Sequence, residues 1–140
     1  MDVRVLRRGD EPVLTAVAPD VFDDPIDPAA AAAFLADPRH HVAVAIEDGV
    51  VVGFASAVTY VHPDKPRPEL WINEVGVAPT HQRRGLGRRL LDALLDAGRR
   101  DNCSEAWVLA DRSNTGAQQF YASLGADQSP EDAVMFTFSL

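Results

Sequence analysis

The segment Gln82-Arg83-Arg84-Gly85-Leu86-Gly87 is the part of the sequence best suited to bind an anion. It follows an apolar run that ends at Val77 and opens a long leucine-rich helical pattern. Backbone N–H groups at a helix start lack partners within the helix, and the helix dipole adds partial positive charge there. Glycines let a phosphate approach the main chain closely, and four arginines concentrate positive charge at this terminus: Arg83, Arg84, Arg88 and Arg89. The pattern predicts a pyrophosphate site.

Two better-known phosphate motifs do not fit this segment. The dinucleotide fingerprint needs a third glycine where Leu90 stands, and a P-loop needs a Gly-Lys-Ser/Thr sequence that does not follow. Elimination therefore leaves the anion site of some other phosphorylated ligand.

The elements around this segment predict a mixed α/β layer with helices on both faces of one sheet. Asp48-Gly49 is typical of a tight hairpin turn, and Asp27 followed by Pro28 is typical of a helix start. Strands are expected at Val3–Arg7, Val42–Ile46, Val50–Tyr60, Glu69–Val77, Ala106–Ala110 and Ala133–Leu140, and helices at Ala29–Leu35, Arg84–Arg100 and Asn114–Leu124.

Length and composition indicate one soluble globular domain over residues 1–140, with 46% hydrophobic and 24% charged residues. The net charge of -8 argues against a nucleic-acid or membrane partner and favours a small cationic substrate. The single cysteine, Cys103, forms no internal disulfide, and no Cys/His cluster has metal-site spacing. Because no signal peptide or transmembrane segment is evident, we expect a cytoplasmic protein. Because no Cys/His cluster has the spacing of a metal site, we expect it to hold no metal.

The anion-binding segment resembles the coenzyme A pyrophosphate motif of the GCN5-related N-acetyltransferase (GNAT) superfamily: Gln or Arg, two variable residues, Gly, one variable residue, then Gly or Ala. Val77-Ala78-Pro79 stands at the family's usual spacing before it. A second signature, an Asn seven positions before a Tyr with Leu-Gly shortly after, matches Asn114, Tyr121, Leu124 and Gly125. The resemblance extends over about Glu69–Gly125. It implies a single-domain α/β GNAT fold, with a mixed, mostly antiparallel sheet and a splayed strand pair that binds acetyl-CoA.

The resemblance implies a role for each matching residue in holding the coenzyme. The strand Glu69–Val77 would splay from its neighbour around a bulge, so that Val75 and Val77 pair with the pantetheine arm. An N–H of this stretch would polarise the thioester carbonyl. Asn114 would contact the coenzyme arm or orient the loop before the last helix. The pyrophosphate would be held by Gln82, Arg83, Arg84, Gly85, Leu86, Gly87 and Arg88.

Acetyl transfer to an amine needs two proton movements, and the resemblance suggests a residue for each. Tyr121 stands where the family carries its general acid, near the thioester sulfur, although a core aromatic beside Phe120 is the plain structural alternative. Glu74 is a candidate base or partner of a cationic acceptor, against the alternative of an exposed strand glutamate. Asp111 follows a strand end and is a second acceptor-side candidate, or part of an ordinary helix cap.

Within the superfamily, Trp71–Val77 followed by Ala110-Asp111 resembles the aminoglycoside 3-N-acetyltransferases, as does the acidic stretch Val21–Pro25. This resemblance implies an aminoglycoside acceptor bound by Glu74, Asp111, Asp23 and Asp24. The tail Phe136–Leu140 and the Leu124-Gly125-Ala126-Asp127 segment depart from the pattern. Trp71 and Trp107 are interpreted as core or groove wall, without a ligand.

Three other functions stay open from the sequence: a protein N-terminus or lysine acetyltransferase, a non-catalytic acyl-CoA-binding module, and a nucleotide-phosphate binder. The family also contains dimers that associate through the C-terminal strand region. Residues Ala133–Leu140 would either take that role or complete the sheet within one chain.

Overall fold

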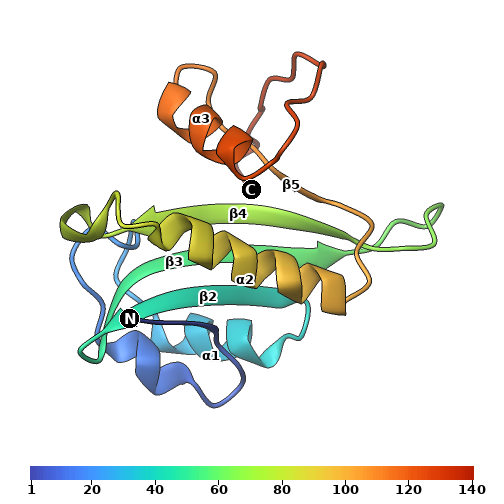
Figure 1. The fold of residues 1–140 in the computed structure, drawn as a ribbon. Coiled ribbons are helices and arrows are strands. Elements are labelled where there is room, and N and C mark those ends of the chain that lie inside the picture. The colour runs from blue at the N-terminus through green and yellow to red at the C-terminus, as the bar shows by residue number, and fades with distance from the viewer. The chain divides into compact units, whose positions relative to one another are not determined.

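The computed structural model describes all 140 residues, Met1–Leu140, as two compact units, Met1–Leu109 and Ala110–Leu140, each of which is described by itself (Figure 1). The first unit holds one five-stranded sheet in the order β1-β2-β3-β4-β5. The strands are β1 Asp2–Val5, β2 His40–Glu47, β3 Val50–Tyr60, β4 Glu69–Val77 and β5 Ala106–Val108. The helices are α1 Pro28–Ala36, α2 Leu86–Arg100 and α3 Thr115–Ser123, with short 3-10 turns η1 Glu11–Thr15 and η2 Pro79–His81.

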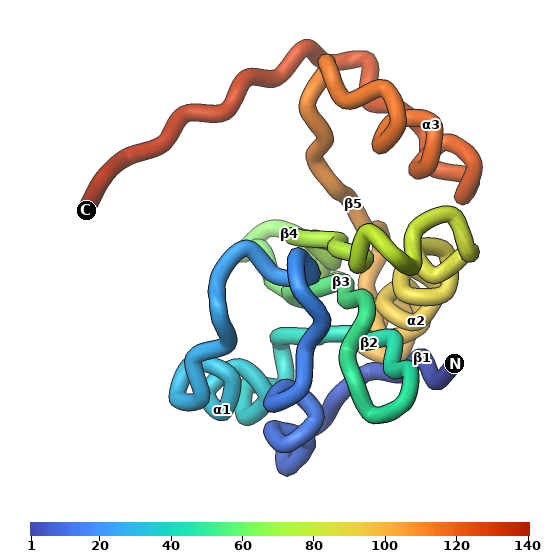
Figure 2. The backbone as a smooth tube through the Cα atoms, turned by 90° about the vertical axis from the view of Figure 1, so that its left-hand side faces the viewer, coloured from blue at the N-terminus to red at the C-terminus, as the bar shows by residue number.

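The sheet is mixed but mostly antiparallel. Neighbouring strands from β1 to β4 pair antiparallel, whereas β4 and β5 pair parallel. Figure 2 shows α1 on one side of the strands and α2 on the other. The predicted α/β fold, with helices on both faces of a mostly antiparallel sheet, is therefore confirmed.

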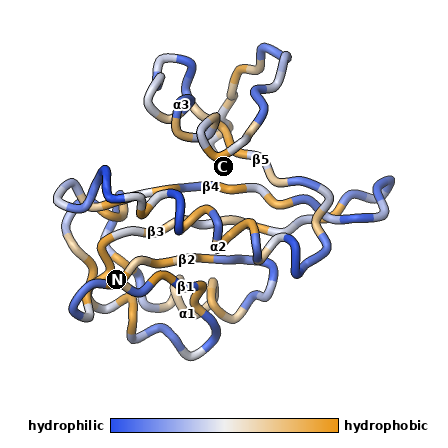
Figure 3. Tube along the Cα trace, in the orientation of Figure 1, coloured by the Kyte–Doolittle hydropathy of each residue, from blue (hydrophilic) through white to orange (hydrophobic).

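The β2–β3 hairpin forms because its turn residues tolerate left-handed backbone conformations. Asp48 and Gly49 have φ angles of 51° and 78°, as the predicted tight turn requires. Behind the turn, Val44 and Val51 are fully buried, as are Leu90 and Leu94 on the apolar face of α2. Figure 3 shows hydrophobic colour along the central strands and hydrophilic colour in the loop between β3 and β4. This core packs the apolar face of α2 against the sheet.

The two helices of the first unit begin as their capping residues dictate. The Asp27 carboxylate accepts hydrogen bonds from the Ala29 and Ala30 N–H groups at 2.9 and 3.2 Å, which confirms the predicted start of α1. α2 begins at Leu86, two residues later than expected. Arg83 and Gly85 have φ angles of 61° and 76°, and residues in the left-handed region cannot continue a right-handed helix.

The second unit consists of α3 and the residues that follow it. The predicted closing strand Ala133–Leu140 is wrong, because residues 126–140 form no strand. The apolar side chains that alternate along this stretch are all exposed: Val134, Phe136, Phe138 and Leu140. A strand is stabilised by its ladder to a neighbour, and alternation along the chain supplies no neighbour. Nowhere does the chain form a helix with the length and apolar character needed to span a membrane.

Candidate functional site

The loop between β4 and α2 has the geometry of an anion site. The Gln82 side-chain amide donates to the Val77 carbonyl at 3.2 Å and draws the loop back onto the end of β4. Gly85 is the N-cap of α2 and carries no side chain that could cap the helix, so the amides of the first turn remain available to a ligand. Arg83 and Arg84 are exposed beside this turn. Arg89 points elsewhere, since its guanidinium donates to the Met1 carbonyl at 3.4 Å.

This loop is anchored to the β2–β3 hairpin by the pair of His81 and Glu47, which the sequence did not predict. The Nε2 atom of His81 hydrogen-bonds to the carboxylate of Glu47, at the end of β2. His81 Nδ1 lies 2.8 Å from the Thr80 hydroxyl oxygen. Because Glu47 and His81 are far apart in the chain, only the β2–β3–β4 register brings them together. The hydrogen bond from His81 holds the pKa of Glu47 below its ordinary value, and the charge of Arg84 acts in the same direction.

We expect the Glu47–His81 pair to stabilise the folded protein at neutral pH and to lose this contribution in acid. A carboxyl whose pKa is lower in the folded than in the unfolded state stabilises the fold above its unfolded pKa of about 4.3. The contribution falls as the pH drops through the folded pKa, because the unfolded chain binds the proton first. The measurement is the free energy of urea unfolding of the natural protein and of Glu47→Gln between about pH 3 and pH 7.

The difference between the two proteins should shrink as the pH falls toward the acid limit. Glu105→Gln, which removes an exposed carboxylate without an ion pair, should show no such trend. A Glu47→Gln difference that stays flat down to the acid limit would contradict the assignment.

β4 parts from β5 within its own length. The parallel ladder joins only Leu70–Ile72 to Ala106–Val108, whereas β4 continues to Val77 paired with β3 alone. The β3–β4 register shifts between Ser56 and Ala57, so that Asn73 is the extra residue of a bulge. The pairing with β5 thus ends where the resemblance places the splay, just before Val75 and Val77.

The predicted acceptor-side carboxylates of the first unit lie near the end of β4. Glu74 is exposed and pairs across the ladder with Ser56. The segment before Asp23 and Asp24 packs on β3, because the Phe22 ring stacks on the Phe54 ring with centroids 3.9 Å apart. None of these three carboxylates forms an ion pair, so their charge is available to a cation.

The other predicted site residues belong to the second unit. The Asn114 side-chain oxygen accepts from the Ala117 N–H at 3.0 Å and caps α3, which fits the predicted orienting role. The Asp111 carbonyl accepts from the Gln118 side chain at 3.2 Å, and the Asp111 carboxylate is exposed. Burial raises the pKa of Tyr121 on α3. It stays a prediction that one site combines β4 with Asn114, Asp111 and Tyr121.

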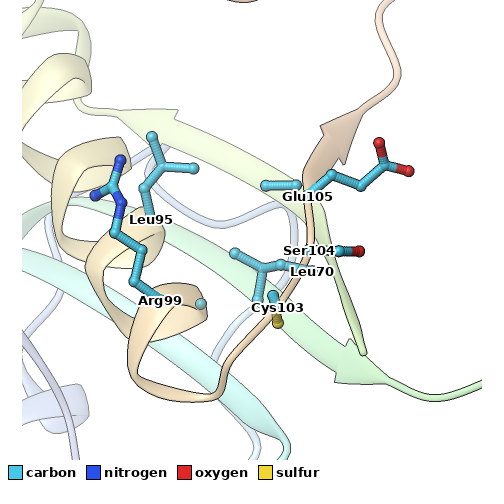
Figure 4. A pocket seen from close by; sticks show the side chains of 8 residues that line it. Leu70, Leu95, Arg99, Cys103, Ser104 and Glu105 are labelled. Carbon is cyan, nitrogen blue, oxygen red and sulfur yellow. The ribbon is translucent and has the colours of Figure 1, made fainter. Parts of the chain in front are cut away.

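No predicted site residue lines either of two cavities of the first unit, although Pro25, which follows Asp24, lines the second. One of about 280 Å³ lies at the C-terminal end of α2, and the other, of about 580 Å³, lies between η1 and α1. Burial raises the pKa of the Cys103 thiol in the first cavity, so this thiol stays protonated at neutral pH. The first cavity is lined by Leu70, Leu95, Gly98, Arg99, Cys103, Ser104, Glu105 and Ala106 (Figure 4). The predicted site residues of the first unit therefore line neither of these two cavities.

Comparison with curated proteins finds acetyltransferases. N-alpha-acetyltransferase RimI of Mycobacterium tuberculosis is 36% identical over 105 residues, which cover 75% of this chain and 63% of that protein. Aminoglycoside N(6')-acetyltransferase type 1 of Salmonella typhimurium is 28% identical over 89 residues, 61% of each chain. The chain thus spans less than two thirds of the length of these relatives. The second relative is named for acetylation at the 6' position. Neither relative supports the more specific resemblance to the aminoglycoside 3-N-acetyltransferases.

Solved structures with the same fold include an aminoglycoside acetyltransferase, meta-AAC0020, from an uncultured soil metagenomic sample. It matches with a TM-score of 0.82 at 22% identity, covering 99% of this chain and 95% of that chain. A ribosomal-protein-alanine N-acetyltransferase from Brucella melitensis matches with a TM-score of 0.73 at 21% identity, covering 98% of each. The profile of the Acetyltransferase (GNAT) family matches residues 9–126, a range that includes both the loop before α2 and the signature on α3. This chain therefore belongs to the acetyltransferase (GNAT) family.

Proposed function

We propose that the protein is an acetyl-CoA-dependent N-acetyltransferase that acetylates a primary amine of an aminoglycoside. The observation that carries this proposal is the parting of β4 from β5 after Ile72, followed along the chain by the arginine-flanked start of α2 at Leu86. An unpaired strand edge can hydrogen-bond an extended amide chain, and an uncapped helix start can bind a pyrophosphate. Coenzyme A presents these two groups in this order along its length.

The chain's own residues would hold the coenzyme at both places. Backbone groups of Val75 and Val77 would pair with the pantetheine arm on the side that β5 leaves open. Amides of the first turn of α2 would bind the pyrophosphate, with charge from the arginines beside it. When bound, acetyl-CoA supplies an activated thioester carbonyl. The pyrophosphate set is Gln82, Arg83, Arg84, Gly85, Leu86, Gly87 and Arg88.

Two side chains would move the protons. Glu74 would accept a proton from the substrate ammonium, directly or through a water molecule, so that the amine can attack with its lone pair. Tyr121 would donate a proton to the departing thiolate. An ordinary phenol has a pKa of about 10, and burial raises the pKa of Tyr121, so this donor is protonated at neutral pH.

The charge of the protein supports a polycationic acceptor. A net charge of -8 attracts cations over long range, and Glu74, Asp23 and Asp24 bring carboxylates without ion pairs to the β4 side. An aminoglycoside carries several ammonium groups on linked rings, so it can satisfy these carboxylates together; Asp111 would add a fourth. The 3-amino group is the regiochemistry that the sequence favours, and the 6'-amino group is the one named for a curated relative.

A thiol-release assay with acetyl-CoA tests this proposal against aminoglycosides, polyamines, amino acids and peptides. We expect release with aminoglycosides, and a kcat/KM about 100-fold lower for Glu74→Gln, since a positioned base contributes about that much. Glu105→Gln is the matched control, because it removes an exposed carboxylate outside the site and should retain activity. Mass and NMR analysis of the product identify the acetylated amine. Coenzyme binding by calorimetry without thiol release would indicate an acyl-CoA-binding module.

A protein N-terminus is the second candidate acceptor. Its support is the 36% identity to N-alpha-acetyltransferase RimI over 105 residues. Thiol release with peptides and none with aminoglycosides would replace the aminoglycoside by a protein N-terminus as the acceptor.

A further inference from the structure

The two tryptophans of the chain form one stacked pair on the β4–β5 ladder. Trp71 and Trp107 are direct register partners, and their rings lie with centroids 5.3 Å apart and an interplanar angle of 10°. Trp107 is partly buried, whereas Trp71 is 38% exposed. The indole N–H of Trp71 has no hydrogen-bond partner. The Trp71 side chain is therefore partly accessible to a ligand and has a free donor at the edge of its ring.

The inner member of this pair is held rigidly. The indole N–H of Trp107 donates to the Tyr60 hydroxyl at 2.6 Å, and that hydroxyl donates to the Glu69 carboxylate at 3.0 Å. Burial raises the pKa of Tyr60, which keeps the hydroxyl protonated as a donor. Because Trp107 cannot rotate without breaking this chain of hydrogen bonds, the stacked Trp71 ring has a fixed support.

A buried negative charge accompanies the pair. Glu69 is only 8% exposed and is the one charged residue in the core. Its carboxylate is paired with no lysine or arginine. The His62 Nε2 atom lies 3.2 Å from it without hydrogen-bond geometry and forms an ion pair with it when the imidazole is protonated. A buried carboxylate attracts a cation more strongly than an exposed one, because less water screens it.

The bulge in β4 brings Trp71 and Glu74 to the same face of the sheet. Trp71 pairs with Val58 and Glu74 pairs with Ser56, and residues two apart on β3 point to one face. Without the extra residue Asn73, positions 71 and 74 would point to opposite faces. The two ladder positions are about 7 Å apart along the strand, roughly the span of one sugar ring.

On the basis of the proposed acetyl transfer, we propose that Trp71, supported by Trp107, is a specificity-determining platform on which a ring of a cationic amino sugar stacks with its amine directed to Glu74. The apolar face of a sugar ring covers an indole ring well. An ammonium group on that ring is attracted by the indole faces and by the Glu69 charge. A linear polyamine offers charge without a ring, and a neutral disaccharide offers a ring without charge, so neither meets both conditions.

Binding to the platform can be measured without catalysis. Trp71 and Trp107 are the only tryptophans in the chain, so fluorescence excited at wavelengths that tyrosine does not absorb reports on this pair alone. Kanamycin should change the fluorescence saturably, and spermidine and trehalose should bind at least about 10-fold more weakly by calorimetry. Equal binding of all three compounds, or saturating kanamycin without a fluorescence change, would overturn the platform.

Substitutions separate the platform from the general fold. Trp71→Ala should raise the Kd and KM for kanamycin about 10-fold, and Trp71→Phe should restore most of the affinity because it keeps a ring. KM for spermidine and the Kd for coenzyme A should stay unchanged in both variants. Val61→Ala, which truncates another exposed apolar side chain, should leave all these values unchanged.

The outcomes also separate this inference from the proposed function. Kanamycin binding at the tryptophans without thiol release would support the platform and contradict the proposed acetyl transfer. If Trp71→Ala releases thiol with kanamycin at an unchanged KM, the result would support the acetyl transfer and contradict the platform.

Discussion

Replacing Tyr121 with Phe is expected to lower kcat about 100-fold and to leave the Kd for coenzyme A within about twofold. The substitution keeps the aromatic ring beside Phe120, whose centroid lies 5.3 Å from that of Tyr121, and removes only the hydroxyl. Without this donor, the departing thiolate would take its proton from water. Steady-state thiol release gives kcat, and calorimetry gives the coenzyme affinity.

The pH profile adds an independent readout to this prediction. Burial raises the pKa of Tyr121 above the ordinary phenol value of about 10, so ionisation of this group should limit activity only at strongly alkaline pH. The alkaline limb should be absent in the Phe variant. Tyr60→Phe is the matched control, because it removes the hydroxyl of the only other tyrosine. Since this hydroxyl accepts from Trp107, its loss should change KM for the amine rather than kcat. Unchanged turnover in Tyr121→Phe would remove this residue from the mechanism.

The substitution Gly76→Ala should destabilise the protein by about 3 kcal/mol, because the site has no room for a methyl group. A Cβ atom on Gly76 would lie 2.9 Å from the Phe54 ring and closer still to the Val21 carbonyl oxygen. Neither neighbour can yield easily. The Phe54 ring is held by its stacking on Phe22, and the Val21 carbonyl oxygen belongs to the backbone. Urea unfolding monitored by circular dichroism measures the loss.

Gly116→Ala provides the control for this substitution. Its nearest neighbour would be the Asn114 side-chain oxygen at 3.7 Å, an ordinary contact, and alanine is the better helix former in α3. This variant should be as stable as the natural protein or slightly more stable. Because Gly76→Ala must displace the segment that leads to Asp23 and Asp24, its KM for an aminoglycoside should also rise. A loss below about 0.5 kcal/mol would contradict the close packing.

Features determined by neighbours along the chain were predictable from the sequence. The Asp48-Gly49 turn, the Asp27 cap of α1 and the strand Glu69–Val77 appear in the structure as expected. The segment from Gln82 to Gly87 was predictable for the same reason, since glycine spacing and arginine charge are local properties. The start of α2 was missed by two residues because Arg83 adopts a left-handed conformation that its residue type does not indicate.

The sequence by itself therefore determined the family motif, the order of elements and the charged loop, all of which depend on residues close together in the chain. Only the tertiary structure decided the long-range pairs, because strand register and the Asn73 bulge set which side chains meet. Register brings Glu47 to His81 and Trp71 to Trp107, and it turns Glu74 to the face of Trp71. The same reason explains the wrong strand at Ala133–Leu140: alternation is a local property, whereas a strand needs a partner from elsewhere in the fold.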